Sequence, residues 1–344
     1  MAIIIDRVVK IASNQGGFQG SLSGTDFGES LASLGDLDGD GVTDVAVGAE
    51  DINGGGNDRG GVYILFLNRN GTVKRQQLIS NTAGGFNQAL DNEDRFGVDV
   101  AGLGDVNGDG IPDLAVGVEN DDDGATNAGA VWILFLNRNG TVQGRQKISA
   151  TQGGFTGDLD AGDQFGHGLT QLGDFNGDGV PDLAIGARGD DDGGSNRGAV
   201  YVTFLNRNGT VQGFQKLSDT AGNFTANLDN DDQIGVKLDA FDINGDGRQE
   251  LVIGAFLMTM AEPIEALTIR SFSIAMAQPI DSKRSAISKG ALPGFWKMPI
   301  ALAAIWPLLA MWTTMVARKL QSEPMRAAGP GRGLAAFSEQ QRHS

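Results

Sequence analysis

The sequence predicts an all-β fold built from repeated four-stranded units. A nine-residue acidic segment starts at Asp36, Asp105, Asp174 and Asp242, at spacings of 69, 69 and 68 residues. A fixed period of this size indicates a repeat architecture. Each unit also contains short runs rich in Val, Ile, Phe and Tyr between turn residues, which favours strands. Residues 1–255 show no helical period. Four short strands in a unit this long are typical of a β-propeller blade with long loops.

The strands are expected in the same order in every unit. First strands begin at Phe27, Phe96, Phe165 and Ile234 and run to the acidic segment. Second strands are the apolar runs 45–48, 114–117, 183–186 and 251–254. Third strands are 62–67, 131–136 and 200–205, and fourth strands are 72–79, 141–148 and 210–217. Asn-Arg-Asn-Gly joins the third strand to the fourth at 68–71, 137–140 and 206–209, and Asn-Gly is a strong signal for a hairpin turn.

The acidic segments have the composition of calcium loops. Positions 1, 3 and 5 carry Asp or Asn side chains, position 7 offers a backbone carbonyl, and position 9 carries a further carboxylate. Glycine at position 6 permits a sharp turn. Hard oxygen ligands without His or Cys favour Ca²⁺. The candidate ligands are Asp36, Asp38, Asp40, Val42 and Asp44; Asp105, Asn107, Asp109, Ile111 and Asp113; Asp174, Asn176, Asp178, Val180 and Asp182; and Asp242, Asn244, Asp246, Arg248 and Glu250.

Two other interpretations of these segments were weighed. Asp, Asn and Gly also favour plain surface turns, but four copies in register argue against that explanation. An EF-hand needs Glu at position 12 and a helix on each side, whereas the flanks here are short and strand-like. The expected pattern is therefore strand, calcium loop, strand.

Charge divides the chain into two parts. Residues 1–255 hold 16 Lys and Arg against 38 Asp and Glu, whereas residues 256–344 hold 10 against 5. We therefore expect a repeat domain at 1–255 and a non-repeat tail at 256–344. The acidic part argues against nucleic acid as a partner and for cations. The absence of Cys excludes disulfides and thiolate metal sites. The first residues do not read as a signal peptide.

Three spaced elements together resemble a known family. Phe165-Gly166, then the segment from Asp174 to Asp182, then Ala184-Ile-Gly-Ala187 is similar to the FG-GAP repeat of integrin α-chain propellers and their bacterial relatives. The resemblance covers about residues 8–255. It implies a calcium-stabilised β-propeller with the calcium loops on one face and a protein or carbohydrate ligand on the opposite face, often in adhesion. It also implies an extracellular or cell-surface location.

The chain departs from that family in its number of blades. Integrin-type propellers have seven blades, whereas this sequence contains three full units and part of a fourth, so the ring is incomplete or small. One solution is a four-bladed ring in which residues 3–13 supply the last strand of the fourth blade. In the fourth unit Ile234 replaces Phe and Glu250 replaces Asp, so this loop departs furthest from the family pattern.

Loops on the opposite face hold further acidic runs. They include residues 121–123, 190–192 and 229–232. One interpretation is additional cation binding, and the other is a solvated acidic surface that maintains solubility.

The tail has two interpretations. Residues 298–317 carry no charge over a length that spans a bilayer, which predicts a transmembrane helix and membrane anchoring. The abrupt loss of Gly and Asp inside a repeat also fits a frameshifted or fused reading frame, in which case the chain is a truncated, non-functional fragment.

The sequence favours a calcium-binding module over an enzyme. His167 is the one histidine of the repeat part, and a lone His on a strand is usually a surface or packing residue. Paired carboxylates repeat with the fold, whereas an active site is usually unique within it. The alternative, by analogy, is the propeller part of a polysaccharide-acting or phospholipase-type enzyme.

Overall fold

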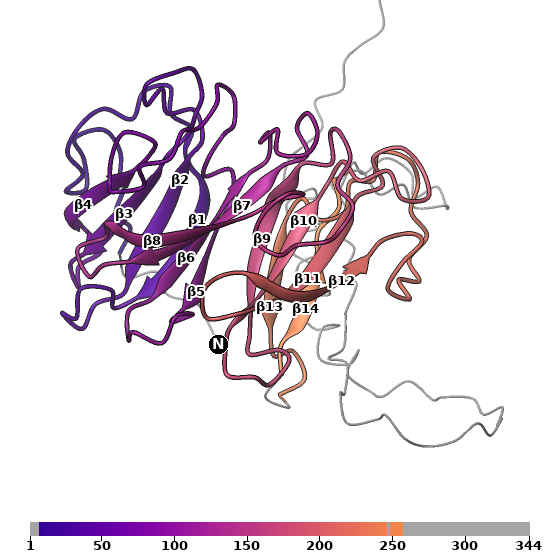
Figure 1. Cartoon of the computed structure of the whole chain (residues 1–344). Coiled ribbons are helices and arrows are strands. Elements are labelled where there is room, and N and C mark those ends of the chain that lie inside the picture. Colours follow the sequence, from indigo (N-terminus) through magenta and orange to yellow (C-terminus); the bar gives the residue numbers. More distant parts are fainter. Residues whose placement is uncertain (1–6, 246–247, 257–344) are drawn as a thin grey trace, which may run out of the picture. The chain divides into compact units, whose positions relative to one another are not determined.

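The computed structural model describes residues 7–245 and 248–256. These residues form strands without α-helices, which confirms the predicted all-β class (Figure 1). The strands make three four-stranded sheets and one two-stranded sheet, each antiparallel with neighbours in chain order. We call these sheets blades 1 to 4.

The strand bounds agree closely with the predicted ones. Blade 1 contains β1 (Phe27–Gly35), β2 (Asp44–Ala49), β3 (Val62–Leu67) and β4 (Val73–Ile79). Blade 2 contains β5 (Val100–Gly104), β6 (Asp113–Val118), β7 (Ala130–Leu136) and β8 (Val142–Ile148). Blade 3 contains β9 (Phe165–Gly173), β10 (Asp182–Ala187), β11 (Ala199–Leu205) and β12 (Val211–Leu217). Blade 4 contains β13 (Leu238–Phe241) and β14 (Glu250–Ile253). Two first strands, β5 and β13, begin four residues after the predicted Phe96 and Ile234.

The predicted Asn-Gly hairpins are present in all three complete blades. In blade 1, Gly71 has a φ of 79°, and the Asn70 side chain accepts hydrogen bonds from the backbone N–H and hydroxyl of Thr72. The same contacts recur at Asn139 and Asn208. Because these turns fix the register, Val62 lies opposite Ile79 in β3 and β4.

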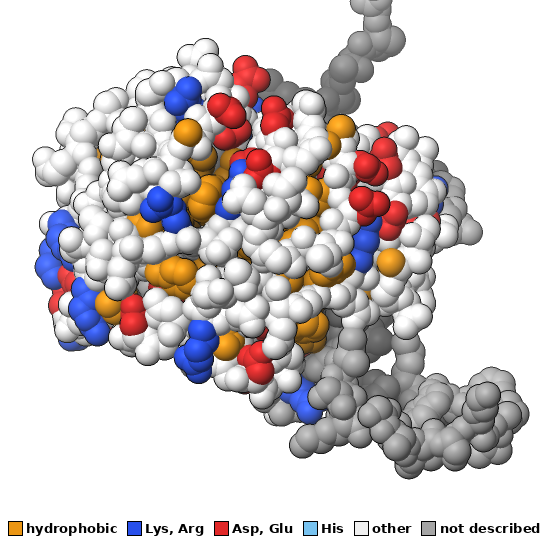
Figure 2. All heavy atoms as spheres, in the orientation of Figure 1, with side chains coloured by type: hydrophobic (Ala, Val, Ile, Leu, Met, Phe, Trp, Pro, Cys, Tyr) orange, Lys and Arg blue, Asp and Glu red, His pale blue; other side chains and the backbone are white. Residues whose placement is uncertain are grey.

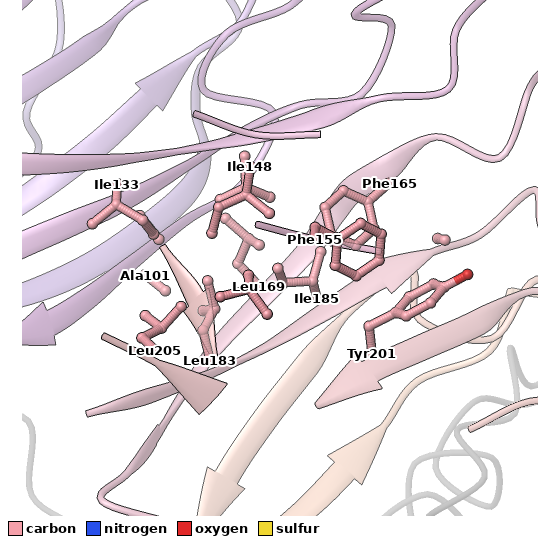
Figure 3. Packing of buried hydrophobic residues seen from close by; sticks show 14 of the residues in the cluster. Ala101, Ile133, Ile148, Phe155, Phe165, Leu169, Leu183, Ile185, Tyr201 and Leu205 are labelled. Atoms are coloured by element: carbon pink, nitrogen blue, oxygen red, sulfur yellow. The ribbon is translucent and has the colours of Figure 1, made fainter. Parts of the chain in front are cut away.

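Adjacent blades pack through apolar clusters. Between blades 2 and 3, the Phe155 ring lies 4.9 Å from Phe165 and 5.3 Å from Tyr201. Figure 3 shows these rings beside Ile185, with the Tyr201 hydroxyl pointing away from the cluster. The equivalent rings between blades 1 and 2 are Phe86, Phe96 and Trp132. Aromatic pairs of this kind add about 0.5–1.5 kcal/mol beyond the area that they bury.

A glycine in the second strand lets neighbouring blades approach closely. A side chain at Gly48 would clash with the carbonyl oxygen of Gly97, in the Phe-Gly pair of the next blade. Gly117 meets Gly166 in the same way, and Gly186 meets Gly235. The Phe-Gly pair and the second-strand glycine are thus two sides of one contact between blades, which explains why they recur together.

The first described residues pack on blade 1. The carbonyl of Gly16 accepts a hydrogen bond from Val73 N, as Gly84 does from Val142 N and Gly153 from Val211 N. Phe18 packs against Phe27 and Tyr63. Residues 7–13, the described part of the predicted closing strand, form no ladder with β13 or β14. Lys10 lies against Gly16 as Leu78, near the end of β4, lies against Gly84, so Lys10 takes the place of a residue near the end of a fourth strand. Closure of a four-bladed ring by residues 7–13 is not observed.

The first strands of the four blades line a hollow of about 550 Å³. Leu31 on β1 and Phe241 on β13 are large apolar residues that stay 67% and 48% exposed. Within residues 7–245 and 248–256, no helix has the length and apolar character needed to cross a membrane. The predicted segment 298–317 and the rest of the tail from 257 lie outside the described residues.

Candidate metal centres

The predicted calcium loops join the first strand of each blade to the second. They lie between β1 and β2, β5 and β6, β9 and β10, and β13 and β14. The strand, loop, strand pattern expected from the sequence is therefore present in all four blades.

Position 1 organises each complete loop. Asp36 accepts hydrogen bonds from the backbone N–H groups of Gly39, Asp40 and Gly41 at 2.8–2.9 Å. Asp105 and Asp174 each accept the same three bonds in their own loops. The backbone therefore curls around one carboxylate, and positive φ angles of 83° at Gly39 and 81° at Gly41 permit that turn.

Positions 3 and 5 face each other across the loop. In the first loop one carboxylate oxygen each from Asp36, Asp38 and Asp40 lies within 4.8 Å of the others. In the second loop the Asn107 amide donates to Asp109 Oδ2 at 3.1 Å, and Asn176 donates to Asp178 at the same distance. Positions 1, 3 and 5 are thus brought together, as a cation held by oxygen ligands requires.

Position 7 packs back on position 5. The backbone N–H groups of Val42, Ile111 and Val180 each donate at 2.9 Å to the aspartate two residues earlier. This contact holds residue 7 against the loop through its backbone N–H, and the predicted role of its carbonyl as a ligand stays a prediction.

Position 9 has a structural contact that the sequence did not predict. Asp113 is fully buried, and its two oxygens accept from Val106 N in the loop and Leu136 N at the end of β7. Asp44 and Asp182 make the equivalent bonds. This carboxylate therefore fastens the loop to the third strand. Its burial was readable from its place directly before the apolar run of the second strand.

Burial changes the proton affinity of position 9. It raises the pKa of Asp113 to about 7 and that of Asp182 to about 6, although backbone hydrogen bonds act in the opposite direction. Burial also raises the pKa of Asp44. A nearby cation would favour the ionised form of all three side chains.

The fourth loop is only partly described. Asp242 accepts from Gly245 N at 2.6 Å, and Glu250 accepts from Ile243 N and from the Asn244 amide, both at 2.9 Å. The longer Glu250 side chain therefore reaches the loop as the aspartates do elsewhere. Asp246 lies outside the described residues, and the role of Arg248 at position 7 stays a prediction.

The first loop contains a cation from the protein itself. Lys74 Nζ lies 3.1 Å from Asp38 and 2.6 Å from Asp40, and Arg75 lies 3.5 Å from Asp38. Gln143 and Gln212 stand at the Lys74 position in blades 2 and 3. Within the described part of the chain, the position 1 and 5 aspartates of the second and third loops form no ion pair.

The acidic runs at the opposite end of the blades are paired with lysines. Lys147 Nζ lies 2.7 Å from both Asp121 and Asp123. Lys216 lies 2.6 Å from Asp190 and 2.9 Å from Asp192. These two runs are therefore neither solvated acids alone nor open cation sites. Figure 2 shows several small groups of Asp and Glu side chains with Lys or Arg beside them.

His167 belongs to another ion-paired group. Its Nδ1 lies 2.7 Å from Glu119 Oε2, and Arg188 lies 3.3 Å from the same oxygen. Arg95 lies 3.2 Å from Glu119 Oε1. Although burial acts to raise the pKa of Glu119, these three partners hold it below its usual range. His167 is thus one of the partners that stabilise the buried Glu119 carboxylate.

A family model for the FG-GAP repeat matches residues 27–65, 96–134 and 165–203. Each match covers the Phe-Gly pair, the predicted calcium loop, the second strand and most of the third strand of one blade. The chain is an FG-GAP repeat protein. This confirms the resemblance found in the sequence.

Curated relatives extend the integrin α likeness of the FG-GAP repeat protein. It is 37% identical over 177 residues to integrin alpha-2 of Mus musculus, covering 50% of this chain and 14% of the relative. Identity to integrin alpha-11 of Homo sapiens is 35% over 179 residues, 50% of this chain and 13% of the relative. Phosphatidylinositol-glycan-specific phospholipase D of Bos taurus is 33% identical over 156 residues, 44% of this chain and 17% of the relative. The chain thus spans less than a fifth of these relatives.

Proposed function

We propose that this chain is a calcium-binding β-propeller module that acts in adhesion or ligand binding outside the cell or at its surface. Calcium has a structural role in this proposal. The ligand, a protein or a carbohydrate, binds on the face opposite the calcium loops. The likeness to integrin α chains favours a protein.

One observation carries the calcium assignment. In three loops the position 1 aspartate is held by three backbone N–H groups, and in the first loop one oxygen each from positions 1, 3 and 5 lies within 4.8 Å of the others. In the second and third loops no described lysine or arginine forms an ion pair with the aspartates at positions 1 and 5. Carboxylates crowded in this way repel one another, so a divalent cation stabilises the loop.

Linkage gives the size of the effect. Extracellular calcium modules have Kd values of about 10⁻⁴ to 10⁻³ M. At ten times Kd one site contributes roughly 1.4 kcal/mol to the free energy of unfolding, and three sites contribute roughly 4 kcal/mol. For a domain of this size such a sum corresponds to a rise in Tm of about 8–16 °C. The proposed module is therefore more stable to unfolding where the calcium concentration is high.

The test is calcium titration of the full chain by calorimetry, with thermal melts in calcium and in EDTA. We expect at least three bound ions. Asp109→Ala should remove one ion and roughly 1.4 kcal/mol of calcium-dependent stability at ten times Kd. Asp158→Asn, which removes an exposed charge outside the loops, is the matched control. A calcium-independent Tm, or an Asp109→Ala variant that binds as many ions as the wild type, would contradict the proposal.

The phospholipase relative defines the alternative function. Its match covers 44% of this chain, and His167 Nδ1 contacts the buried carboxylate of Glu119. A hydrolase assay against glycosylphosphatidylinositol and polysaccharide substrates distinguishes the alternatives, because turnover by the purified chain would favour the enzyme.

A further inference from the structure

A second group of carboxylates lies at the other end of blade 1. One oxygen each from Asp26, Glu50 and Asp51 lies within 4.8 Å of the others. Asp26 precedes β1, and Glu50 and Asp51 follow β2, so the group is at the opposite end of β2 from the first calcium loop. A hydrogen bond from Asp51 N to Thr25 O, at 3.4 Å, joins the two segments.

One oxygen of this group is buried without a partner. Glu50 is 8% exposed, and its Oε2 accepts no hydrogen bond. The nearest cation, Arg95, lies 3.8 Å from the other oxygen, Oε1, and is closer to Glu119. An ionised carboxylate taken out of water without full compensation is costly, so this oxygen points to a missing ligand.

The next repeat shows what Glu50 lacks. Glu119 stands 69 residues later and is surrounded by His167, Arg188 and Arg95 at 2.7–3.3 Å. Arg95 itself occupies the position that Asp26 holds in blade 1. Blade 2 thus places a cationic side chain where blade 1 places a further acid. Blade 1 therefore has an additional negative charge beside Glu50, whereas blade 2 has a positive charge beside the equivalent Glu119.

We propose that Asp26, Glu50 and Asp51 bind a divalent cation of the calcium and magnesium class, with the unpartnered oxygen of Glu50 as its central ligand. Three carboxylates and no nitrogen or sulfur ligand suit a hard ion. The site is separate from the four loops.

Location is tested by iron-mediated cleavage of the full chain. Fe²⁺ with ascorbate and peroxide cuts the backbone near bound metal, and competition with Ca²⁺ or Mg²⁺ identifies sites for those ions. We expect calcium-protected cuts near residues 26 and 50, in addition to cuts in the loops. Cuts in the loops without cuts at 26 and 50 would overturn this inference and leave the proposed function intact. The reverse pattern would overturn the proposed function alone.

Variants identify the ligands. Glu50→Gln and Asp51→Asn should each lose the cuts at 26 and 50 and one equivalent of bound calcium, with the loop cuts unchanged. Glu29→Gln removes a charge from a neighbouring exposed position and should retain both. Circular dichroism verifies the fold, and exposed Asp26→Asn replaces any variant that fails to fold. Retention of cuts and stoichiometry in folded variants would contradict the site.

Discussion

The two ends of blades 2 and 3 treat crowded carboxylates in different ways. At the calcium-loop end, Asp105 and Asp174 are held by backbone N–H groups, and no described lysine or arginine pairs with them. At the opposite end, Lys147 and Lys216 each lie between two aspartates. Acidic runs that look alike in the sequence therefore have their negative charge balanced in different ways. At one end we propose a bound metal ion, and at the other end a lysine of the protein balances the charge.

The first prediction concerns the end at which a lysine pairs with the aspartates. Lys147 is 11% exposed and Asp121 is 9% exposed, so Lys147→Met leaves the buried Asp121 carboxylate without its ionic partner. We expect a loss of about 3–5 kcal/mol in the free energy of unfolding. Because no metal is involved, denaturant melts in calcium and in EDTA should show the same loss. Lys10→Met, at an exposed position, is the control and should change this free energy by no more than about 0.5 kcal/mol. Full rescue of Lys147→Met by calcium would mean that the aspartates form a metal site.

The second prediction concerns a buried acid at that same end. Burial raises the pKa of Asp94 to about 7, although Asp94 accepts a hydrogen bond from Asp91 N. The folded state therefore holds a proton that the unfolded state releases near pH 4, so stability falls as pH rises from about 4 to about 7. Asp94→Asn should remove this fall, gaining on the order of 1–3 kcal/mol over the wild type by pH 7.

Urea melts from pH 4 to 8 measure this difference. Subtracting the variant cancels the titration of the calcium loops, which both proteins share. The equivalent variant Asp163→Asn should reach its full gain in the free energy of unfolding over wild type at a lower pH, because the pKa of Asp163 is raised to about 6. A constant difference between Asp94→Asn and wild type over this range would refute the assignment.

The third prediction concerns the first predicted calcium loop, which differs from the second and third in having a lysine paired with its aspartates. Lys74 is 40% exposed and pairs with Asp38 and Asp40, where an ion would sit. Lys74→Ala should tighten calcium binding at this loop, with little change in stability in EDTA. Gln143→Ala, at the equivalent place in blade 2, is the control and should leave calcium affinity unchanged. Weaker calcium binding by Lys74→Ala would show that the lysine supports the site.

Local sequence signals predicted most of the fold. Asn-Gly turns and runs of apolar residues placed the strands, because hairpin register and burial follow from neighbouring residues. The Phe-Gly pair and the second-strand glycine recur together because they contact each other between neighbouring blades, as Gly48 and Gly97 do.

Partners distant in the chain were not predicted. Lys147 follows Asp121 by 26 residues, and their pairing depends on how the fourth strand passes the loop after the second. The group formed by Asp26 and Glu50 likewise depends on the pairing of β1 with β2. Position 9 was predicted as a ligand from its charge alone, whereas its hydrogen bonds to the third strand arise from the blade as a whole.

A crystal structure in about 10 mM calcium, above the Kd expected of extracellular modules, tests the central claim most directly. A long-wavelength anomalous map identifies calcium by position. We expect ions in loops 105–113 and 174–182, about 2.3–2.6 Å from oxygens at positions 1, 3 and 5, and no ion between Asp121 and Asp123. Empty loops together with calcium at the lysine-paired aspartates would contradict the account.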